Sequence, residues 1–61
     1  MKEKSKSRRA LAAEFYALAL HHEKEHDYMK AYDYYQQSLK LHEDEEVKKA
    51  YLKLLSIIGP L

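Results

Sequence analysis

Apolar residues recur along this chain at the three- and four-residue spacing that places side chains on one side of an α-helix. The first stripe consists of Leu11, Ala12, Phe15, Leu18, Ala19 and His22. Ser7 stands just upstream, where a hydroxyl can cap the first turn of a helix. The spacing therefore predicts a helix over about residues 8–25.

Two further stripes follow at the same spacing. The second consists of Tyr28, Ala31, Tyr32, Tyr35, Ser38, Leu39 and His42, and the third of Val47, Ala50, Tyr51, Leu54, Leu55 and Ile58. The carboxylate of Asp27 can accept from the first turn of the second helix, and an acidic run, residues 43–46, precedes the third. We expect helices over about residues 28–41 and 44–58, and the short connections make them antiparallel neighbours in an up-down-up order.

Composition supports an all-α fold. The chain has no Thr, Asn or Trp, and its only β-branched residues are Val47, Ile57 and Ile58, so strands are not expected. The single glycine and single proline, at positions 59 and 60, indicate a helix stop. Sixty-one residues form one domain, whose core is small enough that a partner is expected to stabilise it. The absence of cysteine excludes disulfides and thiolate metal sites and favours an intracellular protein. We expect it in the cytoplasm rather than in the nucleus.

Basic charge is concentrated at the start of the chain. Five of the eleven Lys and Arg residues lie in the first nine positions, although the formal net charge is only +1. We expect residues 1–8 to be a basic, flexible arm and residues 9–61 to be the folded domain. No aromatic residue interleaves the basic ones, so nucleic-acid binding is not expected. No run approaches the roughly 18 apolar residues of a membrane span.

The segment His22-Glu23-Lys24-Glu25-His26 matches a zinc-enzyme pattern. On a helix this spacing places two imidazoles on one face to hold zinc, with the glutamate as general base. A chain this short has no second lobe to supply a third ligand and a substrate cleft. We therefore expect no enzyme, no cofactor and no small-molecule substrate, and we keep His22 and His26 as weak metal candidates.

Several apolar side chains project away from the predicted inner stripes, and three short helices cannot cover them all. They are Tyr16, Leu20, Tyr34, Leu41 and Leu52. A group of this kind indicates an interface with a protein partner or with a second copy of the chain. A two-fold dimer is the simplest arrangement that would cover them.

The middle of the chain carries a more specific pattern. Asp27-Tyr28-x-x-Ala31-x-x-x-Tyr35-x-x-Ser38-Leu39-x-Leu41 resembles the second half of a tetratricopeptide repeat, in which small residues let two helices approach closely. Upstream, the family's first-helix positions are matched by Phe15, Leu18 and Ala19. The chain departs from the pattern at His22, where the family places an aromatic, at His26, its turn glycine, and at Glu43, its proline.

The resemblance covers one repeat, about residues 12–45. It implies a helical hairpin followed by a capping helix, packed through Phe15, Leu18, Ala19, Tyr28, Ala31, Tyr35, Ser38 and Leu39. It also implies a non-catalytic protein-interaction module. Many members of the family grip a C-terminal carboxylate with Lys and Asn, but the matching positions here are the uncharged Tyr16 and Leu20. Acidic C-terminal peptides are therefore not expected to bind.

A second family remains as an alternative. The pair Ala31-x-x-x-Tyr35 is similar to a signature on the second helix of microtubule-interacting-and-trafficking domains, which are three-helix bundles that bind a peptide helix. That family has a longer second helix, whereas the acidic run at Glu43 comes about two turns too early here.

Overall fold

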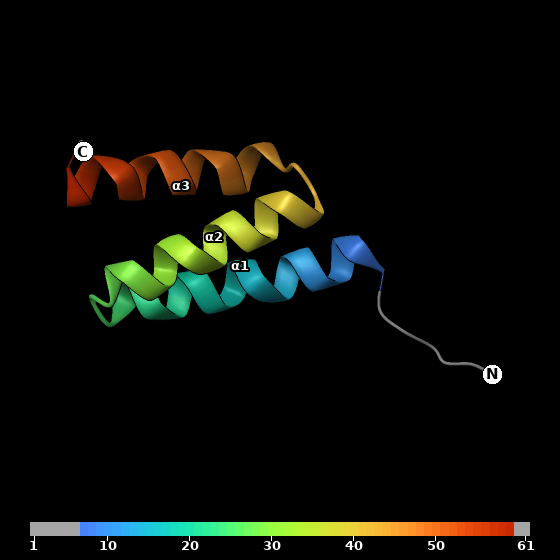
Figure 1. Ribbon diagram of the computed structural model, residues 1–61, viewed down its shortest axis with the longest axis horizontal. Helices are drawn as coiled ribbons and strands as arrows, with labels where there is room; N and C mark the ends of the chain where they lie inside the picture. The colour runs from blue at the N-terminus through green and yellow to red at the C-terminus, as the bar shows by residue number, and fades with distance from the viewer. Residues whose placement is uncertain (1–6, 60–61) are drawn as a thin grey trace.

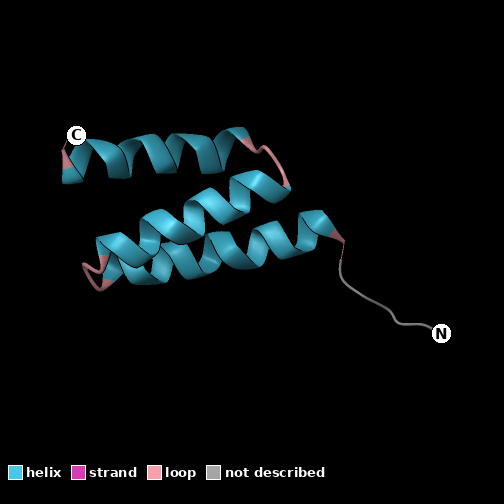
Figure 2. Cartoon of the chain, in the orientation of Figure 1, coloured by secondary structure: helices cyan, strands magenta, loops and turns pink. Residues whose placement is uncertain are grey.

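The computed structural model describes residues 7–59 as three consecutive helices. They are α1 (Arg8–Lys24), α2 (Tyr28–Leu41) and α3 (Glu45–Ile58), and each helix runs antiparallel to the one before it (Figure 1). Within the described range every element is helical, with short connections (Figure 2). The predicted all-α three-helix fold is confirmed. Most of the predicted basic arm, residues 1–6, lies outside the described residues, and Arg8 already belongs to α1.

Side chains at the helix ends explain why the helices begin where they do. The hydroxyl of Ser7 accepts a hydrogen bond from the Ala10 N–H at 3.1 Å, and the carboxylate of Asp44 accepts one from the Glu46 N–H at 2.9 Å. The expected cap at Asp27 is wrong, because its side chain makes no hydrogen bond to the first turn of α2. Its Oδ2 atom lies instead 3.9 Å from His22 Nδ1, across the turn between α1 and α2.

The contact between α1 and α2 is built on small residues and buried polar contacts. Ala19 and Ala31 have no exposed surface, which is how two helix backbones come close together. Ser38 is also fully buried, and its hydroxyl donates to the Ala12 carbonyl at 2.7 Å. This bond satisfies a hydroxyl that would otherwise be costly to bury.

The contact between α2 and α3 is built on larger side chains. Val47 and Leu54 are buried, and the rings of Tyr32 and Tyr51 stack with their centroids 5.6 Å apart. Tyr35 reaches both neighbouring helices: its ring lies 6.4 Å from that of Tyr51, and its hydroxyl donates to Glu23 Oε1 at 2.6 Å. In Figure 1, α2 accordingly runs between the other two helices.

The inner side of α1 differs from the predicted stripe. Leu18, expected inside, is 39 % exposed, whereas Tyr16, expected outside, packs against the core. The buried line passes through Ala12 and Ala19, because these small residues let α2 approach most closely there. Larger residues such as Leu18 are displaced to the flank of the contact. Ile58 of the third stripe is likewise 41 % exposed, at the end of α3.

Candidate functional site

The five residues predicted to form an interface divide into two groups. Tyr34 is not free, since its ring stacks between those of Phe15, at 5.8 Å, and His22, at 5.4 Å. The expectation that Tyr16 and Tyr34 project away from the core is therefore wrong. Leu41 is half-buried, while Leu20 and Leu52 remain 43 % and 54 % exposed. Leu20 and Leu52 are thus the two predicted residues most available to a partner.

The other residues expected to pack the hairpin differ in how deeply they are buried. Ala19, Ala31, Tyr35 and Ser38 are fully buried, and half-buried positions are taken by Phe15, Tyr28 and Leu39. Leu18 is the member of this set that lies on the surface, and the difference follows from the close approach at Ala19.

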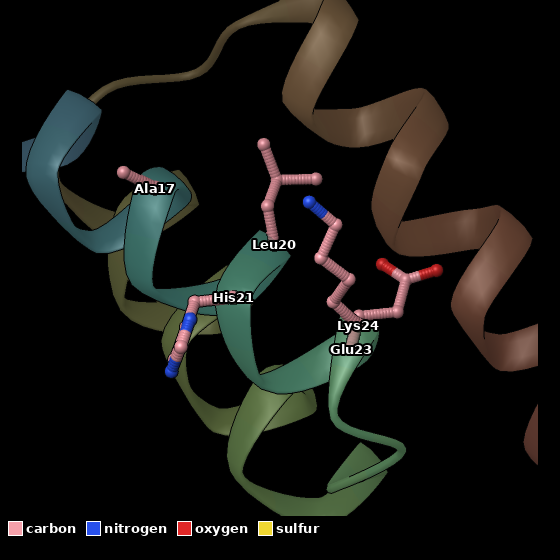
Figure 3. A pocket seen from close by; sticks show the side chains of 5 residues that line it. All are labelled: Ala17, Leu20, His21, Glu23 and Lys24. Carbon is pink, nitrogen blue, oxygen red and sulfur yellow. The ribbon is translucent and has the colours of Figure 1, made fainter.

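Leu20 lies on a continuous side of α1 that packs against the core through Tyr16 and is otherwise largely exposed. We call this side the α1 face and define it as the stripe Arg9, Ala13, Tyr16, Ala17, Leu20 and Lys24, with spacings of three, four and seven residues. Around Leu20 the surface forms an open hollow of about 640 Å³, which Ala17, His21, Glu23 and Lys24 also line. In Figure 3 the side chains of Leu20, Glu23 and Lys24 extend from α1 toward the side on which α3 lies.

The N-terminal part of the α1 face adjoins the start of α3. A smaller hollow of about 200 Å³ is lined there by Arg9, Ala13 and Tyr16 together with Asp44 and Glu46. Charges therefore occupy both ends of the face. Arg9 lies with two carboxylates at one end, and Glu23 and Lys24 lie at the other.

The environment of Tyr16 disfavours ionisation of its hydroxyl. Partial burial raises the pKa of the phenol first, and the negative charges of Glu46, Asp44 and Glu23 raise it further. Carboxylates near both ends of the α1 face thus act on one aromatic residue at its middle. A neutral phenol presents an apolar ring with a hydrogen-bonding tip, which suits a protein interface.

Two tyrosines and a glutamine form a hydrogen-bonded cluster at the exposed edge of the contact between α2 and α3. Gln36 Nε2 donates to the hydroxyl of Tyr32 at 3.1 Å and to that of Tyr51 at 3.3 Å. The pKa of Tyr32 is raised, mainly by its hydrogen bond with Tyr51. Sequence reasoning placed both rings in the packing but missed Gln36, whose position four residues after Tyr32 was the available signal. The cluster has the character of a packing contact between two helices.

The zinc-enzyme pattern is not presented on one helix. Helix α1 ends at Lys24, and His26 lies in the following turn with φ 65°, so His22 and His26 do not share a helix face. Glu23 is engaged by the Tyr35 hydroxyl. Within residues 7–59 no group of three or more His, Cys, Asp or Glu side chains is arranged to hold a metal ion.

Other exposed apolar residues were not singled out from the sequence as interface residues. Met29 is 75 % exposed and Ile57 49 %, and the latter continues the α3 stripe seven residues after Ala50. None of the helices in the described part of the chain is long and apolar enough to cross a membrane. Comparison with models of protein families, with curated proteins and with solved structures yields no match to this chain.

Proposed function

We propose that this chain is a non-catalytic protein-interaction module that binds a partner protein, or a second copy of itself, through the α1 face. The observation that carries the proposal is the exposure of Leu20 in a hollowed part of that face, beside the partly buried ring of Tyr16. Apolar and aromatic side chains at the centre of a surface, with charged residues around them, are typical of protein interfaces.

The resemblance to a tetratricopeptide repeat supports this function. Ala19 and Ala31, which match the family's small positions, are fully buried where α1 and α2 meet. His26 stands at the position of the turn glycine and has a left-handed backbone, φ 65°, which glycine adopts most readily. In that family the first helix of each repeat presents side chains to the bound peptide. The α1 face would be the corresponding surface here.

The nature of the α1 face also favours binding over catalysis. The polar group that its uncharged middle offers is the Tyr16 hydroxyl, whose pKa is raised. A general acid or base works best with a pKa near the operating pH, whereas the pKa of this phenol is raised above 10.

Site-specific photo-crosslinking tests the proposal. A benzophenone amino acid replaces Leu20 in one variant and the exposed Lys30 of α2 in a matched control, and each is irradiated in extracts of the native cells. We expect discrete protein adducts from position 20, of a foreign protein or of the chain itself, and few from position 30. Absence of adducts from position 20, or equal yields from both positions, would contradict the proposed function.

A further inference from the structure

The proposed function leaves open what covers the α1 face, and the distribution of charge on it points to one partner. We propose that the α1 face pairs with the same face of a second copy, with the two α1 helices antiparallel about a two-fold axis near Tyr16 and Leu20. This inference rests on the proposed function, because it names the partner of the same surface.

The shape of the face permits a close pairing of helices. Ala13 and Ala17 are exposed and have short side chains, so the backbone of another helix can approach there. The larger Tyr16 and Leu20 stand beside them, and Leu20 keeps 43 % of its surface exposed. In a two-fold pairing centred between these two residues, Tyr16 of each chain lies against Leu20 of the other. The apolar middle of the face is thereby covered on both chains.

The charges select the antiparallel direction. Lys24 lies six residues beyond the centre of the pairing, about 9 Å along the helix, and Ala12 lies equally far on the other side. The carboxylates of Asp44 and Glu46 line the hollow at Ala12 and Ala13. An antiparallel pairing therefore brings Lys24 of one chain to Asp44 and Glu46 of the second copy.

A parallel pairing would instead place Lys24 beside Lys24, and the Asp44 and Glu46 carboxylates beside their own copies. Like charges in contact across an interface are costly. Lys24 therefore meets the carboxylates of Asp44 and Glu46 only when one copy is reversed.

The size of the chain makes a second copy a sufficient partner. The surface area of the chain is 4638 Å². A stable interface buries about 800 Å² on each partner, which is roughly a sixth of that surface. The 17 residues of α1 extend for about 25 Å, and the start of α3 adds to the same side. In a two-fold dimer the same patch is buried on both chains, so one surface supplies both sides of the interface. Small domains commonly supplement a limited core in this way.

Sedimentation velocity over about 10 μM to about 500 μM tests the proposal, with circular dichroism to confirm that each variant is helical. We expect the wild-type chain to form a dimer as concentration rises. Leu20→Glu should weaken dimerisation about a hundredfold, whereas the control Met29→Glu, at an exposed apolar residue of α2 outside the α1 face, should leave it unchanged. A dimer that is lost with Met29→Glu and kept with Leu20→Glu would overturn the assignment of the interface.

A charge exchange tests the direction of the pairing. Lys24→Glu should weaken the dimer about tenfold, while Lys30→Glu, the matched charge reversal on α2, should not. The double variant Lys24→Glu with Glu46→Lys should restore it, because the exchanged charges meet between two chains. Within one chain these residues lie at opposite ends of the α1 face, so no internal pair can produce the rescue. Weakening without rescue would overturn the antiparallel arrangement.

The outcomes separate this inference from the proposed function. A wild-type chain that stays monomeric at about 500 μM would overturn self-pairing. Adducts of a foreign protein at position 20 would in that case still sustain an interaction module. If neither a dimer nor any adduct is found, both proposals fail.

Discussion

The two helix contacts of this molecule are built in opposite ways. Between α1 and α2 the smallest side chains, Ala19 and Ala31, meet without exposed surface, and a buried hydroxyl bonds a backbone carbonyl. Between α2 and α3 the contact is made by rings and branched residues, with the hydrogen bonds of Gln36 at its exposed rim. One contact brings the backbones together, and the other fills the space between them with side chains.

This difference teaches where the fold is specific and where surface remains. Close packing between small residues leaves no room for a larger side chain, so this contact defines the angle and the distance between α1 and α2 closely. Because α1 and α3 each pack mainly on α2, part of the surface of each stays exposed, including Leu20 on α1 and Leu52 on α3. The close packing of α1 on α2 therefore stabilises the hairpin and leaves the α1 face available to a partner.

The largest expected effect on stability comes from creating a cavity in the contact between α2 and α3. Leu54 is fully buried, and Leu54→Ala removes its side chain and leaves a cavity, so we expect a loss of about 2–5 kcal/mol in the free energy of unfolding. The matched change Leu52→Ala, at a leucine that is 54 % exposed, should cost less than about 1 kcal/mol. Urea unfolding followed by circular dichroism measures both. Equal losses would mean that α3 does not pack through Leu54.

Placing a larger side chain in the contact between α1 and α2 should have the next largest effect on stability. Ala31→Leu adds a side chain where the two helices are closest, and overpacking of this kind costs about 1–3 kcal/mol. Lys30→Leu adds the same side chain on the exposed side of α2 and should leave the free energy of unfolding nearly unchanged. Thermal melts of both variants provide the comparison. Coincident melting temperatures would argue against close packing at Ala31.

A smaller effect is expected at the residue that joins both contacts. Tyr35→Phe removes a buried hydroxyl that donates to the Glu23 carboxylate, and hydrogen bonds to charged groups contribute about 1.5 kcal/mol or more. Tyr32→Phe removes a rim hydroxyl and should cost less than about 0.5 kcal/mol. If the two variants unfold at the same urea concentration, the bond to Glu23 adds no stability.

The raised pKa of Tyr35 predicts how the free energy of unfolding changes in alkali. Burial, the hydrogen bond to Glu23 and the charge of Glu23 raise the pKa of Tyr35 above its usual value of 10. Above about pH 10 the unfolded chain loses this proton while the folded chain keeps it, so stability falls as pH rises. Tyr35→Phe should flatten the decline measured by urea unfolding between about pH 9 and about pH 11. An unchanged slope would assign the decline to other groups.

The sequence predicted the helices well because their signals are local. Spacing, the cap at Ser7, the acidic run before α3 and the stop at Gly59 all act within a few residues, and the helix bounds agree to within a residue. The rotation of α1 about its axis was less accessible, because it depends on which residues of α2 come closest. Leu18 and Tyr16 were exchanged between core and surface for that reason.

The candidate site was predictable in part. Leu20 was identified because it breaks the inner stripe, and it remains exposed. Tyr34 breaks the stripe in the same way but is covered by Phe15 and His22, which no single-helix pattern reveals. The carboxylates of Asp44 and Glu46 join the α1 face through the tertiary fold, since about 30 residues separate them from Tyr16 in sequence.

The smallest predicted effect concerns the turn between the two helices of the hairpin. His26 has φ 65°, a left-handed conformation that costs a residue with a side chain about 1–2 kcal/mol. Glycine avoids this cost but loses more backbone entropy on folding, about 0.5–1 kcal/mol. The edge contact of the His26 ring with Tyr28, at 5.9 Å, is also lost. His26→Gly should therefore stabilise the fold by about 0.5 kcal/mol.

His26→Ala separates the backbone from the ring in this prediction. Alanine removes the ring but keeps a Cβ atom in the left-handed conformation, so it should be slightly less stable than the wild type. The glycine variant should then exceed the alanine variant by about 1 kcal/mol, because the two differ at this turn in their backbone preference alone. His21→Gly, inside α1, should have the opposite sign and cost up to about 1 kcal/mol. Thermal melts that rank alanine above glycine at position 26 would show that the turn imposes no left-handed backbone there.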